Sequence, residues 1–197
     1  MKIALRFAVA LALIAAGIAL SGCKKPPPPP HETPREWQLL ASELPAALLS
    51  VSGRSPTDVY VVGADKGQGP LVLHFDGKKW VELHTGTRGD LWWVQALPNG
   101  PALMAGAGAR VLRFDGNRFE CMVTPGLARQ TVYGVWGTSG TNVFAVGLGG
   151  TILHYDGVSW TAQSSGTTKT LNGIWGTSAG DTIFVVGDSG TVRRRTP

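Results

Sequence analysis

Charged residues are scarce in this chain of 197 residues, of which only 16% are Asp, Glu, Lys or Arg. The formal net charge is +5, but five of the 18 basic residues and only one of the 13 acidic residues lie before residue 36. The rest of the chain is therefore close to neutral. Binding to nucleic acid phosphates needs a clustered basic surface, and beyond residue 36 the only run of three basic residues is 193–195. The sequence predicts no nucleic-acid partner.

The chain also lacks the 3.6-residue apolar period of amphipathic helices, which excludes a helical solenoid. It contains instead 27 glycines, 13 prolines and seven tryptophans, a composition typical of short strands joined by tight turns. Hydrophobic residues make up 43% of the chain, enough to bury the core of one globular domain. The composition predicts an all-β protein.

A convincing catalytic or metal-binding set is missing as well. His31 and His84 have no cluster of cysteines or carboxylates beside them in the sequence. Ser139 and Ser178 fall in predicted turns, and no histidine or aspartate is placed beside both of them. The sequence therefore predicts no metal ion, no cofactor and no catalytic residue.

The first 22 residues have the features of a signal peptide, because two basic residues precede an apolar run over 7–20 that ends in small residues. The end of this run resembles the bacterial lipobox, with Leu20, Ser21 and Gly22 followed by Cys23. The resemblance implies cleavage before Cys23, lipidation of its sulfur and acylation of its new amine. A lysine in the next position, rather than an aspartate, favours the outer membrane. We therefore expect a lipoprotein of the bacterial cell envelope, attached to the membrane through its N-terminal lipid.

Residues 23–35 are expected to form a tether between the lipid and the folded domain. Five consecutive prolines at 26–30 favour polyproline II, which rises about 3.1 Å per residue and gives a stiff spacer of roughly 15 Å. With Cys23 lipidated, Cys121 is the only remaining thiol, so an internal disulfide is excluded. We expect Cys121 to be a small buried hydrophobic residue.

The remainder of the chain, residues 36–197, repeats one unit of about 40 residues. The first strand of each unit is predicted at 48–53, 91–97, 132–137 and 171–176. The second strand, at 59–63, 102–106, 143–147 and 182–187, ends in glycine. The third, at 71–77, 110–116 and 151–157, ends in Asp-Gly, which suits a tight turn. The fourth begins with an aromatic residue, namely Trp80, Phe119 or Trp160.

Four short strands in about 40 residues predict the blades of a β-propeller, built from four-stranded antiparallel sheets. Strands such as Val-Phe-Ala-Val-Gly are apolar on both faces, as expected when each blade lies between two neighbours. We place the blades at about 44–85, 87–124, 129–164 and 168–197. A strand at 36–42 is expected to complete the last blade and close the ring. The alternative is an open remnant of a larger propeller, because residues 193–197 replace the expected His-Tyr-Asp-Gly end.

The unit at 136–160 carries the sharpest repeat pattern, Trp-Gly-Thr-Ser, then Val-Phe-Ala-Val-Gly, then Gly-Thr-Ile-Leu-His-Tyr-Asp-Gly, and the unit at 175–192 carries part of it. This pattern resembles the propeller repeats of lipid-anchored bacterial proteins, and more loosely those of the sialidase type and the photosystem-assembly-factor type. The resemblance implies a propeller domain. The aspartate, glycine and tryptophan at 156–160 are more closely spaced than in the sialidase Asp-box, so sialidase activity is not implied.

Candidate binding residues fall in the loops between second and third strands and between blades, the face on which propellers usually bind partners. These loops carry charges of both signs, at Asp65, Lys66, Arg88, Asp90, Arg110, Arg129, Lys169 and Asp188. Trp92 and Trp93 are neighbours on one strand and must face opposite ways, so one of them is a candidate for stacking at the central channel.

One basic position recurs in every unit, at His74, Arg113, His154 and Arg194. A position set by the repeat is set first by blade packing, so we expect these residues to be structural. The alternative is that they surround an anion.

Two kinds of function fit these patterns. The favoured hypothesis is a non-catalytic envelope lipoprotein whose propeller binds or scaffolds a protein or glycan partner. The rival is a hydrolase or lyase acting on envelope polysaccharide, which would need two of Asp65, Asp90 and Asp188 to face each other across the channel mouth. A truncated propeller without independent function is a third hypothesis.

Overall fold

The computed structural model describes residues 36–124 and 130–196. The predicted signal peptide, the lipobox with Cys23, the tether and Arg129 lie outside the described residues. The contacts divide the chain into two units, 1–40 and 41–197, and every described strand belongs to the second. None of the described residues belongs to a helix with the length and hydropathy of a membrane span.

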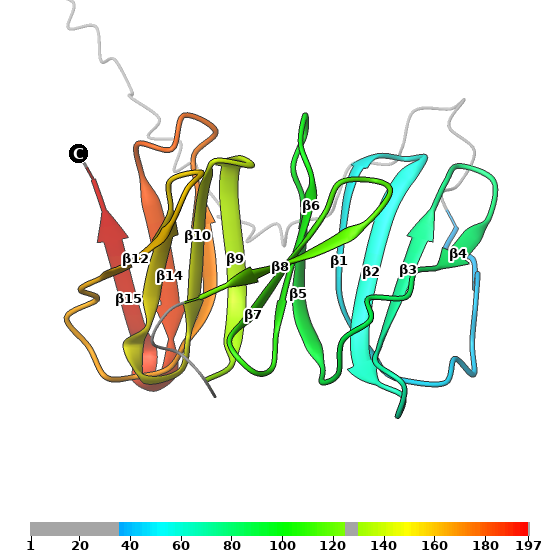
Figure 1. The fold of residues 1–197 in the computed structure, drawn as a ribbon, viewed down its shortest axis with the longest axis horizontal. Coiled ribbons are helices and arrows are strands. Elements are labelled where there is room, and N and C mark those ends of the chain that lie inside the picture. The colour runs from blue at the N-terminus through cyan, green and yellow to red at the C-terminus, as the bar shows by residue number, and fades with distance from the viewer. Residues whose placement is uncertain (1–35, 125–129, 197) are drawn as a thin grey trace, which may run out of the picture. The chain divides into compact units, whose positions relative to one another are not determined.

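Antiparallel sheets make up the second unit, and each is called a blade below (Figure 1). Blade 1 contains β1 (Leu48–Ser55), β2 (Asp58–Asp65), β3 (Pro70–Phe75) and β4 (Trp80–Glu82). Blade 2 contains β5 (Leu91–Ala96), β6 (Ala102–Gly106), β7 (Arg110–Phe114) and β8 (Phe119–Val123). Blade 3 contains β9 (Val132–Ser139), β10 (Asn142–Gly147), β11 (Ile152–Tyr155) and β12 (Trp160–Gln163). Blade 4 contains β13 (Leu171–Gly176), β14 (Ile183–Gly187) and β15 (Thr191–Arg195). The prediction of an all-β protein is confirmed.

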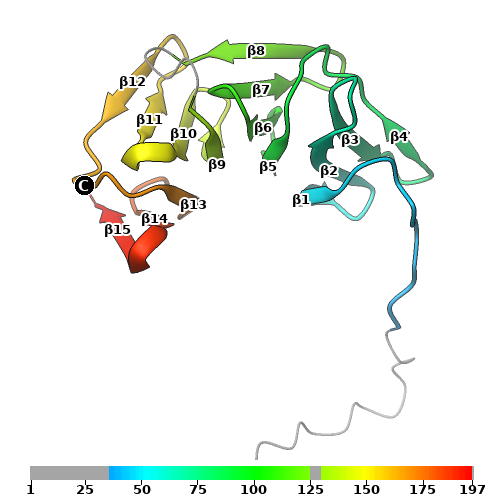
Figure 2. The same cartoon turned by 90° about the horizontal axis from the view of Figure 1, so that it is seen from below.

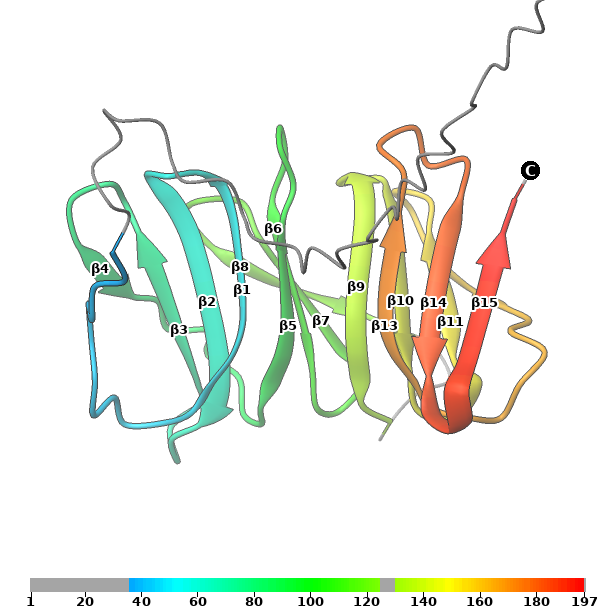
Figure 3. The ribbon, with the colours of Figure 1, turned by 180° about the vertical axis from the view of Figure 1, so that it is seen from behind.

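The four blades stand side by side along an arc, with β1, β5, β9 and β13 on its inner side (Figure 2). Seen from behind, these four inner strands run next to one another across the unit (Figure 3). Two short 3-10 turns, η1 (Leu148–Gly150) and η2 (Asp188–Gly190), connect the second and third strands of blades 3 and 4.

The core lies between the blades, because the second strands of blades 2 and 3 send alternate side chains to two neighbouring blades, and those of blades 1 and 4 pack against one. Tyr60 and Val62 belong to the core cluster shared with blade 2, whereas Phe144 and Val146 belong to the cluster shared with blade 4. A third cluster joins blades 2 and 3 and contains Leu103. The prediction of strands that are apolar on both faces is confirmed, since each blade is covered on each side that has a neighbour.

The Asp-Gly turns have the same geometry in three blades. In blade 3 the Oδ1 atom of Asp156 accepts hydrogen bonds from the backbone N–H groups of Val158 and Ser159, both at 2.8 Å. Gly157 takes a φ of 99°, which an L side chain rarely adopts. The hydrogen bonds from Ser159 and Val158 hold the pKa of Asp156 below its usual value. The same pair of bonds recurs at Asp76 and Asp115.

The predicted strand at 36–42 does not form. These residues are in no strand, Trp37 and Leu39 are exposed, and blade 4 keeps three strands in the order β13-β14-β15. The physical reason is reach. Five residues lie between position 42 and the start of β1, which allows a span of about 22 Å at most, whereas β1 and β15 lie at opposite ends of the arc (Figure 2).

Candidate functional site: a row of strand bulges and an interblade cleft

A β-bulge interrupts the inner strand of every blade at the same position. The pairing register shifts between Leu91 and Trp93 in β5, so Trp92 has no partner in the ladder. The equivalent residues skipped in the other inner strands are Leu49, Tyr133 and Asn172. Bulges re-aim a side chain and are frequent beside functional sites. These four residues, on the inner side of the arc, are called the bulge row below.

Two aromatic residues of the bulge row contact each other. The rings of Trp92 and Tyr133 meet edge to face with 5.9 Å between their centroids, and Trp92 is 37% exposed. Trp93 instead packs against the core between blades 2 and 3. The two neighbouring tryptophans therefore separate as the strand geometry requires, and Trp92 is the one available to a ligand.

Sequence reasoning selected Trp92 but missed the other three residues of the bulge row, Leu49, Tyr133 and Asn172. The signal was present in the comparison of the repeats, because the second residue of the first strand is leucine, tryptophan, tyrosine and asparagine in turn. Neighbouring positions that face between the blades stay apolar or small. A position whose residue type varies in this way inside a regular repeat is not constrained by the interblade packing that restricts the residues next to it.

The loops between blades 1 and 2 are tied together by two of the predicted carboxylates. Asp65 accepts hydrogen bonds from the backbone N–H groups of Gly67 at 2.7 Å, Gly69 at 2.9 Å and Gly89 at 2.6 Å. Its own N–H donates to Oδ1 of Asp90 at 2.8 Å. The hydrogen bonds from Gly89 and Gly69 hold the pKa of Asp65 below its usual value. Asp65 is therefore a poor proton donor, and its visible role is to order the loops.

Three predicted basic residues join the same loop cluster. Arg88 donates a hydrogen bond to the carbonyl oxygen of Gly67, and Arg110 donates to the carbonyl oxygen of Arg88. Lys66 forms an ion pair with Glu82 of β4. The structure thus brings five of the eight predicted loop residues together, as a hydrogen-bonded face between two blades.

The remaining predicted loop residues do not join that cluster. Lys169 is exposed in the connection between blades 3 and 4, where its N–H donates to Oγ1 of Thr167 at 3.1 Å. Asp188 begins η2 and accepts a hydrogen bond at 2.7 Å from the side chain of Asn172, a member of the bulge row. Arg129 lies outside the described residues.

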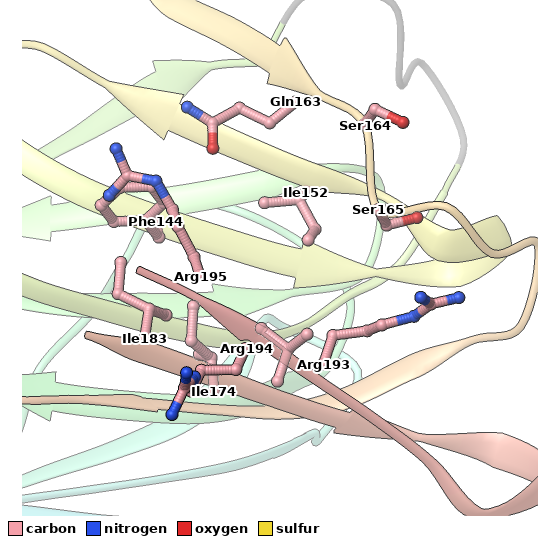
Figure 4. Close-up of a pocket in the computed structure, with 11 residues that line it drawn as sticks. Phe144, Ile152, Gln163, Ser164, Ser165, Ile174, Ile183, Arg193, Arg194 and Arg195 are labelled. Atoms are coloured by element: carbon pink, nitrogen blue, oxygen red, sulfur yellow. The ribbon is translucent and has the colours of Figure 1, made fainter. Parts of the chain in front are cut away.

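A cleft of about 200 Å³ separates blade 3 from blade 4 (Figure 4). Its floor is apolar, and the arginines of β15 stand along one side with Gln163 and Ser165 on the other. Arg193 donates to the carbonyl oxygen of Gly166 at 2.7 Å, and the guanidinium carbon of Arg195 lies 5.3 Å from the ring centroid of Phe144.

The cleft exists because arginines occupy apolar positions of the repeat. Arg193 and Arg195 stand where blade 3 has Leu153 and Tyr155, which pack against the preceding blade. The long, charged side chains do not fill the same space. The sequence did signal this feature, through the loss of the His-Tyr-Asp-Gly pattern at 193–197, but not its consequence for packing.

At the recurring basic position, both histidines, His74 and His154, make their side-chain contacts within their own blade. His74 Nε2 lies 2.8 Å from Oδ1 of Asp58, and its ring stacks on Tyr60 with 4.3 Å between centroids. His154 Nε2 lies 2.8 Å from Oδ1 of Asn142, and its ring stacks on Phe144 at the same spacing. These contacts explain the position by blade packing.

One sequence prediction about the core is wrong. Cys121 is exposed rather than buried, because it lies on β8 at the outer side of blade 2 and takes no part in the core clusters. Over the described ranges 36–124 and 130–196, no group of three or more His, Cys, Asp or Glu side chains is placed to hold a metal ion.

No protein-family model matches the chain, and no curated protein matches it. The β-propeller domain of Cps50 (Swd1) from Myceliophteria thermophila matches with a TM-score of 0.55 at 17% identity, over 75% of this chain and 51% of that one. The structure described as YCF48 bound to D1 peptide matches with a TM-score of 0.53 at 22% identity, over 83% of this chain and 53% of that one. The chain has a β-propeller fold.

The designed Ika4 protein also matches this propeller, with a TM-score of 0.60 at 13% identity, over 83% of this chain and 99% of that one. The chain thus spans about half the length of the Swd1 and YCF48 chains, and nearly all of the designed one. At these identities the likeness concerns the fold, and function has to be argued from the site.

Proposed function

We propose that this protein is a non-catalytic lipoprotein of the bacterial cell envelope whose propeller binds or scaffolds a protein or glycan partner. The observation that carries the proposal is the bulge row on the inner strands, where Trp92 and Tyr133 form a partly exposed aromatic pair. Aromatic rings with one free side supply large contact areas at low entropic cost, and they are enriched where proteins bind partners.

The loops next to this pair support the same proposal. Asp65 and Asp90 fix the loops of blades 1 and 2 to each other before any partner binds, so little order has to be gained on binding. Among proteins with the same fold, YCF48 has been solved in complex with the D1 peptide. This favours a peptide segment as the first partner to test.

The proposed location in the cell envelope is based on the sequence. The lipobox ending at Cys23 and the proline tether would hold the propeller at a membrane surface while leaving its inner strands free to bind. A permanently attached binding module raises the local concentration of its partner at that surface.

The proposal is tested by panning a phage-displayed random peptide library and, separately, by probing an array of bacterial envelope glycans with the purified protein. We expect binders from one of the two, with a loss of binding of tenfold or more in Trp92→Ala. Trp92→Phe retains an aromatic ring and should bind within a few-fold of the wild type. Val158→Ala, which alters an exposed residue on the β11–β12 turn, is the matched control. Binders that are equally retained by Trp92→Ala would place the site elsewhere and refute the role of the bulge row.

A further inference from the structure

The two ends of the arc carry apolar faces that no described residue covers as a neighbouring blade would. On blade 4, Trp175 is 59% exposed and Val186 is 47% exposed. The residues at the equivalent positions of blade 3 are Trp136 and Val146, which are 7% and 0% exposed because blade 4 packs against them. The outward face of blade 4 is therefore an interblade surface without its neighbour.

Blade 1 shows the complementary situation at the other end. Val51 is 66% exposed, whereas Val94, the equivalent residue of blade 2, is 3% exposed because it packs against blade 1. Leu48 is 41% exposed, and its counterpart Leu91 is 1% exposed. The outward face of blade 1 is thus shaped to receive a preceding blade.

The two end faces also match each other in detail. Between blades 3 and 4 the indole of Trp136 lies against Gly176, where a Cβ would come within 2.6 Å of the ring. The outward faces contain the same two partners, because Trp175 is the counterpart of Trp136 and Gly53 is the counterpart of Gly176. One open end therefore carries the large residue and the other the small residue of a pair that meets between blades 3 and 4.

We propose that a second copy of this chain covers both ends, so that blade 4 of each copy packs against blade 1 of the other. Two copies related by a twofold axis along the channel would form two identical interfaces and a closed ring of eight blades. The residues at the two ends support this occupant, because Trp175 of one copy and Gly53 of the other are the counterparts of Trp136 and Gly176, which meet between blades 3 and 4. The binding site depends on it, because the bulge row of one copy lines only half of such a channel.

The same arrangement supplies the strand that blade 4 lacks. In blade 3, Trp160 of β12 packs with Met122 of blade 2 and lies beside Tyr155. The counterparts of those two neighbours are Gln163 and Arg195, which line the cleft between blades 3 and 4. Residues 36–42 of the second copy precede its blade 1 and would pair with β15, so that Trp37 takes the place of the missing aromatic residue.

Cysteine cross-linking of the full chain tests the proposal. In the internal interface a Cβ at Gly134 would lie 3.2 Å from Cγ2 of Ile174, and the counterparts of these residues at the open ends are Gly173 and Val51. We would co-express a chain carrying Gly173→Cys with a differently tagged chain carrying Val51→Cys, both in a Cys121→Ser background, and oxidise the membranes. The expected product is a band at twice the monomer mass that carries both tags and disappears on reduction.

Several outcomes would overturn the proposal. A disulfide that forms inside one chain carrying both substitutions, but not between two chains, would mean that four blades close on themselves. No cross-link in either arrangement, with the far-ultraviolet circular dichroism unchanged, would mean that the ends are not covered by a second copy. Pairing Gly173→Cys with Val158→Cys, which lies outside the end faces, controls for random collision. Native mass spectrometry of the wild-type chain in detergent gives an independent measurement, with two copies expected and a single copy contradicting the proposal.

Discussion

The contact between Trp136 and Gly176 offers a sharp test of how the blades are held together. Gly176 has an ordinary backbone conformation, so the substitution Gly176→Ala adds only a methyl group. That methyl would lie 2.6 Å and 2.7 Å from two carbons of the six-membered ring of Trp136, where ordinary contact begins at 3.4 Å. The indole, which is 7% exposed, would have to move by about 0.8 Å within a packed interface.

Overpacking of this kind costs about 1–3 kcal/mol of the free energy of unfolding. The second substitution is Trp136→Phe, which removes the colliding carbons and leaves an aromatic ring. Alone it should also destabilise the protein, by less than the ~3–5 kcal/mol that complete truncation of a buried aromatic residue costs. In the double variant the collision with the indole is gone and only the backbone oxygen of Thr182, at 3.0 Å, stays close to the added methyl, so the two losses should not add. We expect a favourable coupling of about 1–2 kcal/mol, within the range found for residues in contact.

The measurement is urea unfolding of the four proteins, followed by far-ultraviolet circular dichroism so that the changed tryptophan does not alter the signal itself. Gly140→Ala serves as the matched control, because Gly140 also has an ordinary backbone conformation and its added methyl group would meet nothing closer than 3.4 Å. A neutral Gly176→Ala, or a double variant whose loss equals the sum of the two single losses, would refute the close packing of blades 3 and 4 at this point.

Three further predictions concern single residues. Cys23→Ser should abolish incorporation of a clickable palmitate analogue, and unchanged labelling would refute the anchor. Burial and the charge of Arg195 lower the pKa of His154, so the unfolded chain binds more protons, and stability should fall as the pH drops below about 6.5. Arg195→Gln should raise that pKa in an NMR titration, and an unmoved midpoint would contradict the stated cause. Gly149→Ala should cost about 1–2 kcal/mol for its φ of 66°, whereas Gly150→Ala should cost more in thermal unfolding, because its Cβ would also collide with the backbone oxygen of Thr167. Equal losses would refute that collision.

Much of the fold could be predicted from the sequence, because the same pattern of apolar strands and tight turns recurs in each repeat unit. Asp156 and Gly157 predicted a turn that the structure shows with the same hydrogen bonds in three blades. The two-faced apolar pattern of β10 predicted a blade covered on both sides. The prediction for Cys121 was wrong because it rested on the apolar character of the side chain. Cys121 lies on the outermost strand of its blade, where few residues are available to cover it.

The site was harder to predict because it depends on backbone irregularities that a repeat pattern hides. Trp92 was selected from the sequence, but its partner Tyr133 lies 41 positions away and meets it only because both inner strands bulge at the same point. The sequence favoured a fourth strand for blade 4 and gave an open arc only as the alternative, because the choice depends on the distance between the ends of the arc. The local sequence pattern therefore predicted the strands and turns of each blade, whereas the contacts and distances between blades could be seen only in the structure.

Comparison of the four repeats distinguishes the positions that pack the propeller from the positions that can give it specificity for a partner. Tyr60, Leu103, Phe144 and Phe184 occupy one interblade position and are all large apolar or aromatic residues, as close packing between sheets demands. The bulge row carries leucine, tryptophan, tyrosine and asparagine at one position, which no common packing rule accounts for. Under the proposed binding role, four different side chains along the inner strands would present a different contact to each part of a ligand. A partner that lies across several blades would then be recognised by the order of these residues, which is the property expected of a selective binding surface.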